Sequence, residues 1–599
     1  MAGSSRHTSP KRAGRTSFSS TQTSAASKIS SYTASKDNVA VIDNETSSTT
    51  TDLTAVPGSN IKTQWLPHVT HPGSRLHGNR KLASKSFGDL QVLNIASHIA
   101  PTPKRRTGTN APGDAPIERL PAELLTAIIN LLVLDILPSG LERRNIDLIS
   151  LLLLSKTMHT ATLGSLYNRV MIPHSRTFAK FLAQVNRHRS LGTIVRRLDF
   201  SHFNPSTLFL TASERSQARN LTSETLLQCL VLTPHLQEFL AQEYIDDDLD
   251  AAVLRKLLFG LERLQALDFC GCSSANFKTA FAEVAAETDD WRAELTIKRL
   301  SLHKCITLPV TVLDALMPRL TQLTHLDVAG TRITDNALWS IPKTARLTHL
   351  NLSKCKLLSA PKVIEFLRTH PAVAPDSLQF LSLATDARSH ELLNEDYLTE
   401  LIPVLPKTLK SLNLKGSKMN PSHIDLLLPL TKHLEELSLG RSLMLRDVQR
   451  LFLPEASARP GGEGYVYTDA EVAAQLSWVP HTVRCLDLSD MWGGELDTPT
   501  LFNDSLLLRS LTEPLEAVEF SPGVFKKVRK STGALARYRW RVSEIDARSW
   551  LVRKGGDNEN DSGARHWKMG TRCWGMRKVP VAKAEVGGMY RSYMFGRTI

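Results

Sequence analysis

The chain contains 599 residues, of which 42% are hydrophobic and 22% charged, a composition typical of globular proteins. Its net charge of +14 is uneven, because residues 1–115 carry 14 basic and 6 acidic side chains, residues 525–599 carry 18 and 6, and the segment between them is acidic. Seven cysteines exclude a disulfide scaffold and favour a reducing compartment. No apolar run reaches the roughly 18–20 residues that span a bilayer.

The first 113 residues are rich in Ser and Thr, basic, and without helical or strand periodicity. Such a segment buries too little apolar surface to offset its ordering entropy, so we predict a disordered arm. A mitochondrial transit peptide is the alternative, against which Pro10 and the scarcity of large apolar residues argue. The basic clusters Lys11-Arg12 and Lys104-Arg105-Arg106 are possible nuclear import signals, and we expect a cytoplasmic or nuclear protein.

A helical module is predicted over residues 114–172. Apolar residues recur at three- and four-residue spacing from Leu120 to Leu132, with Pro121 at the first helical position. A polar insertion at 138–147 separates this helix from a second apolar helix over 148–163. A third short element is expected to end the module.

Between residues 190 and 523 one pattern recurs, in which apolar residues occupy the first, fourth and sixth positions of a short core. Most cores start 24 to 33 residues apart, close to the leucine-rich repeat, and the longest gap holds an insertion near 454–480. Such units must stack to bury their apolar faces, so we predict an α/β solenoid, a horseshoe with parallel strands on its concave side. The eleven cores are VRRLDF (195–200), LQEFLA (236–241), LQALDF (264–269), IKRLSL (297–302), LTHLDV (323–328), LTHLNL (347–352), LQFLSL (378–383), LKSLNL (409–414), LEELSL (434–439), VRCLDL (483–488) and LEAVEF (515–520).

Three cysteines support this register. Cys272, Cys305 and Cys355 each lie five residues after the middle apolar residue of their core, which is the Asn/Cys position of the repeat. A shared position in three repeats favours a structural role at the turn after the strand. Cys270 with Cys272 forms C-x-C without a second pair, which is not a zinc signature.

Two rows of side chains are predicted to face outward from the strands, because alternate residues of a strand point to opposite faces. One row is small and polar and includes Asp199, Asp268, Asp327 and Asp487. Larger groups form a predicted partner-binding concave face, although solvation alone would also favour polar residues there. The residues of this face are Arg197, Arg299, His303, His325, His349, Phe380 and Lys415.

No catalytic motif is present in the sequence. Nucleophile elbows, HExxH, phosphate-binding loops and dinucleotide fingerprints are absent, so we expect no enzyme activity, cofactor or metal. His325 and His349 occupy equivalent positions in adjacent repeats but lack an assigned third ligand. The acidic run Asp246-Asp247-Asp248 with Asp250 is interpreted as a solvated loop or helix start.

The run Leu120-Pro121-Ala122-Glu123-Leu124-Leu125, followed by Ile128, resembles the opening of an F-box, and SLLLLSKTMHTATLGSLYNRV (150–170) resembles its end. The resemblance implies a fungal-type F-box protein with a leucine-rich-repeat solenoid. In that family the box docks on the adaptor subunit of SCF-type cullin–RING ubiquitin ligases, and the solenoid captures a protein substrate. The implied adaptor contacts are Leu120, Pro121, Leu124, Leu125 and Ile128.

This sequence departs from the family pattern in its 138–147 insertion, which is longer than the usual link between the helices. An alternative therefore stays open, in which the helices only cap the apolar end of a scaffold without ligase function. We expect a monomer within a complex and no membrane partner.

Residues 524–599 combine basic side chains with Trp540, Trp550, Trp567 and Trp574. We predict a cap on the last repeat. The alternatives are contact with nucleic acid, through aromatic stacking and phosphate pairing, and contact with an acidic protein surface.

Overall fold

The computed structural model describes residues 115–133, 149–172, 174–200, 203, 220–241, 245–287, 291–373, 377–386, 390–453, 478–491, 496, 498–545 and 548–553. All of them belong to one compact unit, residues 106–599. The predicted arm, the 138–147 insertion, residues 454–477 of the longest gap and residues 554–599 lie outside the described residues. Within the described ranges, no helix is long and apolar enough to cross a membrane.

A single sheet of fourteen strands organises the fold. Strands β1 to β12 follow one another in chain order and pair in parallel, whereas β14 and β13 add an antiparallel hairpin after β12. The strands are β1 (Arg169–Met171), β2 (Arg197–Asp199), β3 (Glu238–Leu240), β4 (Ala266–Asp268), β5 (Arg299–Ser301), β6 (His325–Asp327), β7 (His349–Asn351), β8 (Phe380–Ser382), β9 (Ser411–Asn413), β10 (Glu436–Ser438), β11 (Cys485–Leu488), β12 (Ala517–Phe520), β13 (Trp540–Ile545) and β14 (Arg548–Arg553).

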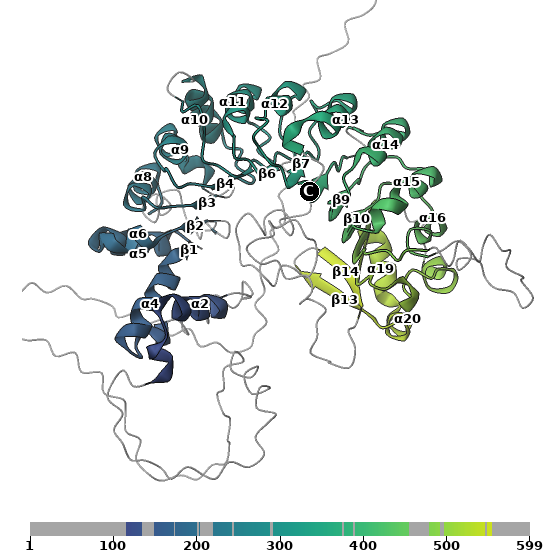
Figure 1. Ribbon diagram of the computed structural model, residues 1–599, viewed down its shortest axis with the longest axis horizontal. Helices are drawn as coiled ribbons and strands as arrows, with labels where there is room; N and C mark the ends of the chain where they lie inside the picture. The colour runs from purple at the N-terminus through teal and green to yellow at the C-terminus, as the bar shows by residue number, and fades with distance from the viewer. Residues whose placement is uncertain are drawn as a thin grey trace, which may run out of the picture. The chain divides into compact units, whose positions relative to one another are not determined.

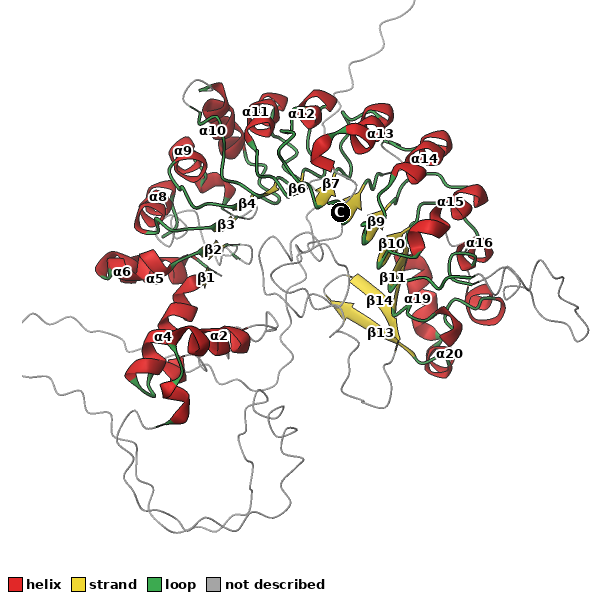
Figure 2. Ribbon diagram, in the orientation of Figure 1, coloured by secondary structure: helices red, strands yellow, loops and turns green. Residues whose placement is uncertain are grey.

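Helices connect the parallel strands and cover one side of the sheet. Figure 1 shows the strands along the inner side of an arc and the helices along its outer side, and Figure 2 separates the two kinds of element by colour. The α-helices are α2 (Ala122–Val133), α4 (Lys156–Asn168), α5 (Ser175–Arg187), α6 (Arg189–Ile194), α8 (Ser223–Leu232), α9 (Ala251–Phe259), α10 (Ala275–Ala286), α11 (Val310–Leu316), α12 (Asp335–Trp339), α13 (Ala360–Thr369), α14 (Glu395–Leu401), α15 (Pro421–Thr431), α16 (Leu445–Gln449), α19 (Pro522–Lys530) and α20 (Thr532–Arg537).

Each of the eleven predicted cores contains a strand, β2 to β12. Their middle apolar residues align across the sheet, as Leu300, Leu326 and Leu350 do in β5, β6 and β7, and all three are fully buried. They belong to one hydrophobic core that runs from Ile172 to Leu551. The sequence pattern therefore predicted an open α/β arrangement with a mostly parallel sheet, and that prediction is confirmed.

The sheet begins earlier than the first predicted core. Helix α4 ends at Asn168, and the extended residues that follow form β1, which pairs with β2. The sequence predicts these residues as part of the helical module, because three residues are too few to show a strand period. At the other end, β14 pairs with β12 and buries Trp540 and Trp550.

The helical module also differs from the prediction, because the single helix expected over 148–163 is interrupted. Residues 149–152 are helical, a turn follows, and Ser155 starts α4 by accepting a hydrogen bond from the Met158 N–H at 3.2 Å. Serine is a favoured N-cap, so the polar residue within the apolar run marks a new helix start.

Candidate functional site

Two helices of the N-terminal module form a small core of their own. Leu125 and Ile129 of α2 pack with Met158 and Ala161 of α4, and this cluster is separate from the main core of the sheet. A spacing of four residues places Leu125 and Ile129 on the same face of α2. The burial of that face leaves the neighbouring face of α2 to solvent.

Three of the five predicted adaptor contacts lie on α2, and Leu120 and Pro121 precede this helix. Leu124 is 53% exposed and Ile128 38% exposed, while Pro121 is exposed and Leu120 is half-buried. Leu125, in contrast, is fully buried against α4. Helix periodicity directs Leu125 into the small core, so its side chain is not part of the exposed surface that carries Leu124 and Ile128.

The exposed apolar surface extends beyond the residues that the sequence analysis named. Ile117 and Ile149 are exposed, and Leu153 is 82% exposed. The sequence predicts Leu153 and Leu154 inside one continuous helix, so it does not indicate that they are exposed. The signal that could have revealed them is Ser155, a helix N-cap that leaves the two preceding leucines in a turn.

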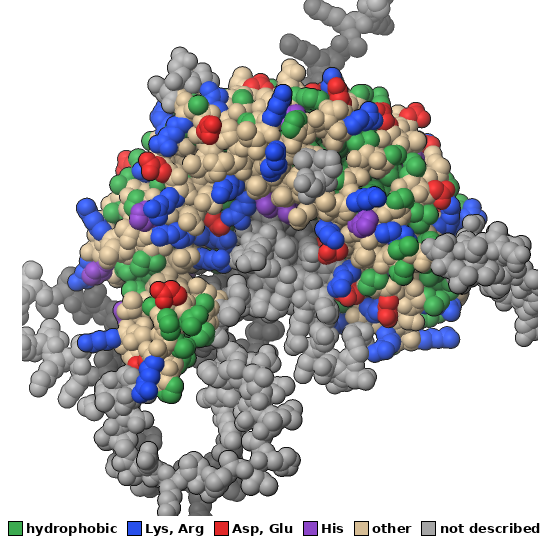
Figure 3. Space-filling view, in the orientation of Figure 1, with side chains coloured by type: hydrophobic (Ala, Val, Ile, Leu, Met, Phe, Trp, Pro, Cys, Tyr) green, Lys and Arg blue, Asp and Glu red, His purple; other side chains and the backbone are tan. Residues whose placement is uncertain are grey.

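The inner face of the sheet carries the first and third residues of each strand. Its first row begins with an ion cluster, in which Glu238 of β3 pairs with Arg197 of β2 and Arg299 of β5. Burial alone would raise the pKa of Glu238, but the two guanidinium groups outweigh it and lower that pKa to about 2. Ala266 of β4 lies between Glu238 and Arg299 in this row. In the face shown in Figure 3, Lys and Arg side chains gather near β1 to β4.

Glu238 is a residue that the sequence analysis missed. It occupies the same strand position as Arg197 and Arg299, so a complete tabulation of that position would have found it. The cluster binds both predicted arginines into the sheet, and Arg197 retains little exposed surface.

The first row continues as a ladder of parallel rings on β6, β7 and β8. The His325 and His349 rings stack with centroids 4.1 Å apart and planes 9° from parallel, and Phe380 follows at 6.0 Å. The Nδ1 atoms of both histidines contact the hydroxyl of the preceding threonine, at 2.8 Å and 2.9 Å. Burial, reinforced by His349 and Arg299, holds the pKa of His325 well below its usual value. The structure thus brings together three residues that the sequence assigned to the binding face.

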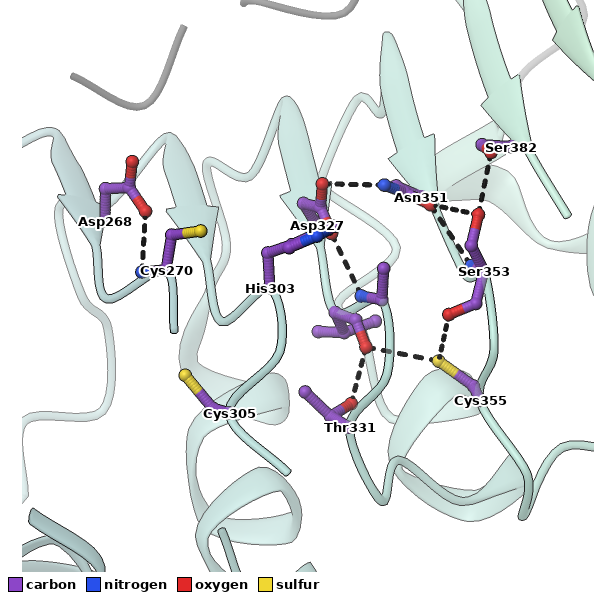
Figure 4. Close-up of polar contacts among 12 residues, drawn as sticks. Asp268, Cys270, His303, Cys305, Asp327, Thr331, Asn351, Ser353, Cys355 and Ser382 are labelled. Carbon is purple, nitrogen blue, oxygen red and sulfur yellow. Dashed lines mark hydrogen bonds and ion pairs between the residues drawn. The ribbon is translucent and has the colours of Figure 1, made fainter. Parts of the chain in front are cut away.

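The smaller polar row has a structural task that the sequence analysis did not anticipate. Oδ1 of Asp327 accepts a hydrogen bond from the Ala329 N–H at 2.9 Å, and Asp268 and Asp487 each bond the N–H two residues onward in the same way. Figure 4 shows this pattern at the ends of neighbouring strands. These side chains are buried and turn the chain after each strand.

His303 and Lys415 lie two residues after the ends of β5 and β9, in the loops that follow these strands. His303 Nδ1 lies 3.2 Å from Oδ1 of Asp327, and Lys415 Nζ lies 3.4 Å from Oδ2 of Asp487. Both predicted binding residues therefore contact the carboxylates of the turn-forming row in a neighbouring part of the sheet.

The cysteines at the repeat position are structural, as predicted. The Cys305 thiol donates to the Phe269 carbonyl at 3.0 Å, and the Cys355 thiol donates to the Val328 carbonyl at 3.1 Å. Each bond joins one repeat to the strand end of the repeat before it, and Figure 4 draws the bond of Cys355. Burial raises the pKa of Cys355 to about 12, which keeps it a thiol.

Among the described residues, no group of three or more His, Cys, Asp or Glu side chains is placed to hold a metal ion. The acidic run is also structural. Oδ2 of Asp246 accepts hydrogen bonds from the Ser273 and Ser274 N–H groups, just before α10, and Asp250 caps α9. The expectation of a helix start is confirmed for Asp250, whereas Asp246 is buried rather than solvated.

The hairpin after β12 orders part of the basic C-terminal segment. Trp540 Nε1 donates to the Leu508 carbonyl at 2.6 Å, and the Arg553 guanidinium lies 4.7 Å from the centre of the Trp540 ring. Trp567 and Trp574 lie outside the described residues. Trp540 and Trp550 thus pack inside the protein.

Comparison with known proteins finds a similarity over half of the chain. The chain is 31% identical to the F-box protein YLR352W of Saccharomyces cerevisiae over 327 residues, which cover 50% of this chain. The match spans 40% of the length of the yeast protein. No protein-family model matches the chain.

Proposed function

We propose that the chain is a leucine-rich-repeat solenoid preceded by an F-box-like module. The repeating strand register, the carboxylate turn after the strand and the cysteine bond to the previous repeat all support a solenoid of equivalent units. The name of the yeast relative supports the F-box part of the proposal.

In the proposed function, the chain recruits a protein substrate to an SCF-type ubiquitin ligase. The observation that carries this proposal is the exposed apolar face of α2, with Leu124 and Ile128 at its centre, on a helix pair that is already packed on its other face. An amphipathic helix of this kind binds by laying its apolar face in a groove of a partner. The partner would be the ligase adaptor subunit.

The inner face of the sheet would hold the substrate. It offers charge in the Arg197–Glu238–Arg299 cluster and ring surface in the ladder that ends at Phe380. The chain itself would perform no chemical step, because ubiquitin transfer would belong to its partners. This role would be exercised by one copy of the chain within the ligase complex, in the cytoplasm or nucleus.

A second candidate is a scaffold without ligase function, whose helices only close the end of the solenoid. One observation favours it, since α4 runs directly into β1 and its Tyr167 ring lies 6.4 Å from Phe181 of α5. Helix α4 therefore does cover the first repeat. Helix α2 packs on α4 in a separate core, and a module that only capped the first repeat would not need this second layer.

Co-purification of the full-length chain with the ligase adaptor subunit tests the proposal. We expect a stable complex, and we expect the double variant Leu124→Asp/Ile128→Asp to abolish it while the fold is kept, because both side chains are already exposed. The matched control is Val231→Asp/Leu511→Asp, which places the same two negative charges on exposed apolar positions, one in α8 and one before β12.

The control variant should bind as well as the natural chain. Loss of binding in both variants would mean that the effect is not specific to α2. A well-folded natural chain that fails to bind the adaptor at all would favour the scaffold.

A further inference from the structure

Three consecutive loops at one edge of the sheet form a basic surface. They follow β5, β6 and β7 and comprise residues 302–309, 328–334 and 352–359, which contain no Asp or Glu. Because the strands are parallel and adjacent, their carboxyl ends place these loops side by side. We call this surface the basic loop edge, and its exposed or partly exposed charged and large apolar residues are Lys304, Ile306, Arg332, Lys354, Lys356 and Leu357.

The backbone at two of these lysines is unusual. Lys304 and Lys354 adopt left-handed conformations, with φ of 60° and 57°. At the same position after β4, β6 and β9 the chain uses Gly271, Gly330 and Gly416, which adopt φ of 80°, 73° and 86°. Glycine is the residue that this conformation favours, and lysine there is strained. A strained residue that replaces the residue best suited to the backbone points to a use for its side chain.

The cations of the basic loop edge are not neutralised within the described part of the protein. Among the described residues, none of Lys304, Arg332, Lys354 and Lys356 forms an ion pair, whereas Lys415 and Lys418 in the loop after β9 pair with Asp487 and Glu395. Burial lowers the pKa of Lys354, and the charges of Lys304 and Lys415 add to that effect, while Asp386 opposes it. These loops therefore carry four cations without a carboxylate partner among the described residues, and Asp335, next to the loop after β6, bonds Ser359 instead.

Two large apolar side chains stand out from the same loops. Ile306 is 60% exposed and Leu357 is 45% exposed, on either side of the loop that carries Arg332. Apolar side chains surrounded by cations are typical of surfaces that rest on anionic membranes, where the apolar groups enter the interface and the cations meet the headgroups.

We propose that the basic loop edge docks on an anionic membrane surface. Protruding side chains favour a lipid interface over a folded protein partner, because a lipid interface accepts apolar tips and neighbouring cations without a matching pocket. The sequence prediction of no membrane partner rested on the lack of a spanning segment, and docking at the surface requires none. This proposal goes beyond substrate recruitment and does not depend on the adaptor.

Both ends of the chain are basic, so simple co-sedimentation with vesicles would also report on them. A position-specific measurement on the full-length chain avoids this. Ile306→Cys is labelled with an environment-sensitive dye, and Leu511→Cys is the control, an exposed apolar position that precedes β12 and so lies at the opposite edge of the sheet. The probes are vesicles of phosphatidylcholine alone and of phosphatidylcholine with phosphatidylserine.

We expect the dye at position 306 to shift to the blue with phosphatidylserine vesicles and to remain unchanged with phosphatidylcholine alone. The dye at position 511 should stay unchanged with both. The parent chain, treated with the same dye, gives the background signal from the natural cysteines. Absence of a shift at position 306, or equal shifts at the two positions, would overturn the proposal.

A charge variant provides the second test, in the labelled Ile306→Cys chain. Lys304→Gly/Lys354→Gly removes two cations and suits the left-handed backbone, so the variant should fold at least as well as its parent. With each surface cation contributing a similar increment, vesicle affinity should fall about 30-fold. Lys407→Ala/Lys410→Ala removes two exposed lysines before β9, at the opposite edge, and should leave the affinity unchanged. Equal losses in both variants, or none in the first, would contradict membrane docking by this edge.

Discussion

The repeat array, which comprises strands β2 to β12 with their helices, and the α2–α4 pair differ in how completely they bury their apolar side chains. In the array, the apolar residues of each strand pack against the helices that cover the sheet, and a single core continues through all the repeats. In the pair, four buried side chains form the whole core, and leucines and isoleucines of similar size remain in water. The array thus buries most of its apolar side chains by itself, whereas the pair leaves a larger share of its own exposed.

The polar groups show the same contrast. On the inner face of the array, carboxylates bond the turn N–H groups and Glu238 binds two arginines, so polar side chains contribute to the fold. In the pair, the cap at Ser155 begins a helix and leaves Leu153 and Leu154 outside it. Buried polar side chains thus stabilise the inner face of the array, whereas the pair exposes apolar side chains.

The largest expected effects come from the two cores. Phe269 packs against the rings of Phe277 and Phe281 at 5.5 Å and 6.0 Å, and Phe269→Ala should lower the free energy of unfolding of the array by about 3–5 kcal/mol. Leu125→Ala should unfold the pair and leave the array intact. Denaturant unfolding of the full chain, followed by hydrogen exchange in each region, measures both. If Leu125→Ala unfolded the array as well, the two regions would be one cooperative unit.

Next in size is the ion cluster of the inner face. Glu238→Gln leaves the buried Arg197 without its carboxylate, and the free energy of unfolding should fall by about 3 kcal/mol. The control is Glu400→Gln, which breaks a half-exposed pair with Arg368 and should cost less than about 1 kcal/mol. Urea unfolding at neutral pH compares the two. Equal losses would show that the cluster contributes no more than a surface pair.

The cluster also has a pH signature. The folded pKa of Glu238 is about 2, below its usual value of 4.5, so its contribution is full above pH 4.5 and is lost as the pH falls toward 2. Glu238→Gln should remove this acid-dependent component.

A separate pH window belongs to His481. Burial, reinforced by Lys432, lowers its pKa from 6.5 to about 4. The unfolded chain therefore binds the proton at a higher pH than the folded chain, and roughly 2–3 kcal/mol of stability should be lost as the pH falls from 6.5 to 4. His481→Phe keeps a ring against Phe452 and should flatten this slope, as unfolding curves across that range would reveal. An unchanged slope would assign the loss to other groups.

The smallest expected effects concern the left-handed position after the strands. Gly330→Ala should destabilise the protein by about 1 kcal/mol, because φ is 73° although there is room for a methyl group. Lys304→Gly should stabilise it by a similar amount, since the strain is relieved. Thermal unfolding of the two variants checks the opposite signs. A loss of stability in Lys304→Gly would mean that its side chain supports the fold.

Much of the array could be predicted from the sequence, because the apolar spacing and the cysteine position repeat together. His325, His349 and Phe380 were found for the same reason, as they occupy one position of the repeat. Tertiary contacts supplied the rest. The sequence gives no sign that Asp327 bonds the N–H two residues onward in its own loop, or that Glu238 reaches across Ala266 to Arg299.

The candidate site on α2 was predicted in part. Helical spacing places Leu124 and Ile128 on one face and Leu125 and Ile129 on the next, but both faces are apolar. Only the packing of α4 decides which face is buried. A break at Ser155 was the one local signal that could have placed α4, and it lay within an otherwise continuous apolar run.

Hydrogen exchange of the full-length chain, with and without the ligase adaptor subunit, tests the binding role of the α2–α4 pair most directly. We predict that the adaptor slows exchange in residues 117–133 and 149–154 and leaves strands β2 to β12 unchanged. Unchanged exchange in the pair, or protection confined to the array, would contradict an adaptor-binding role for the exposed face of α2.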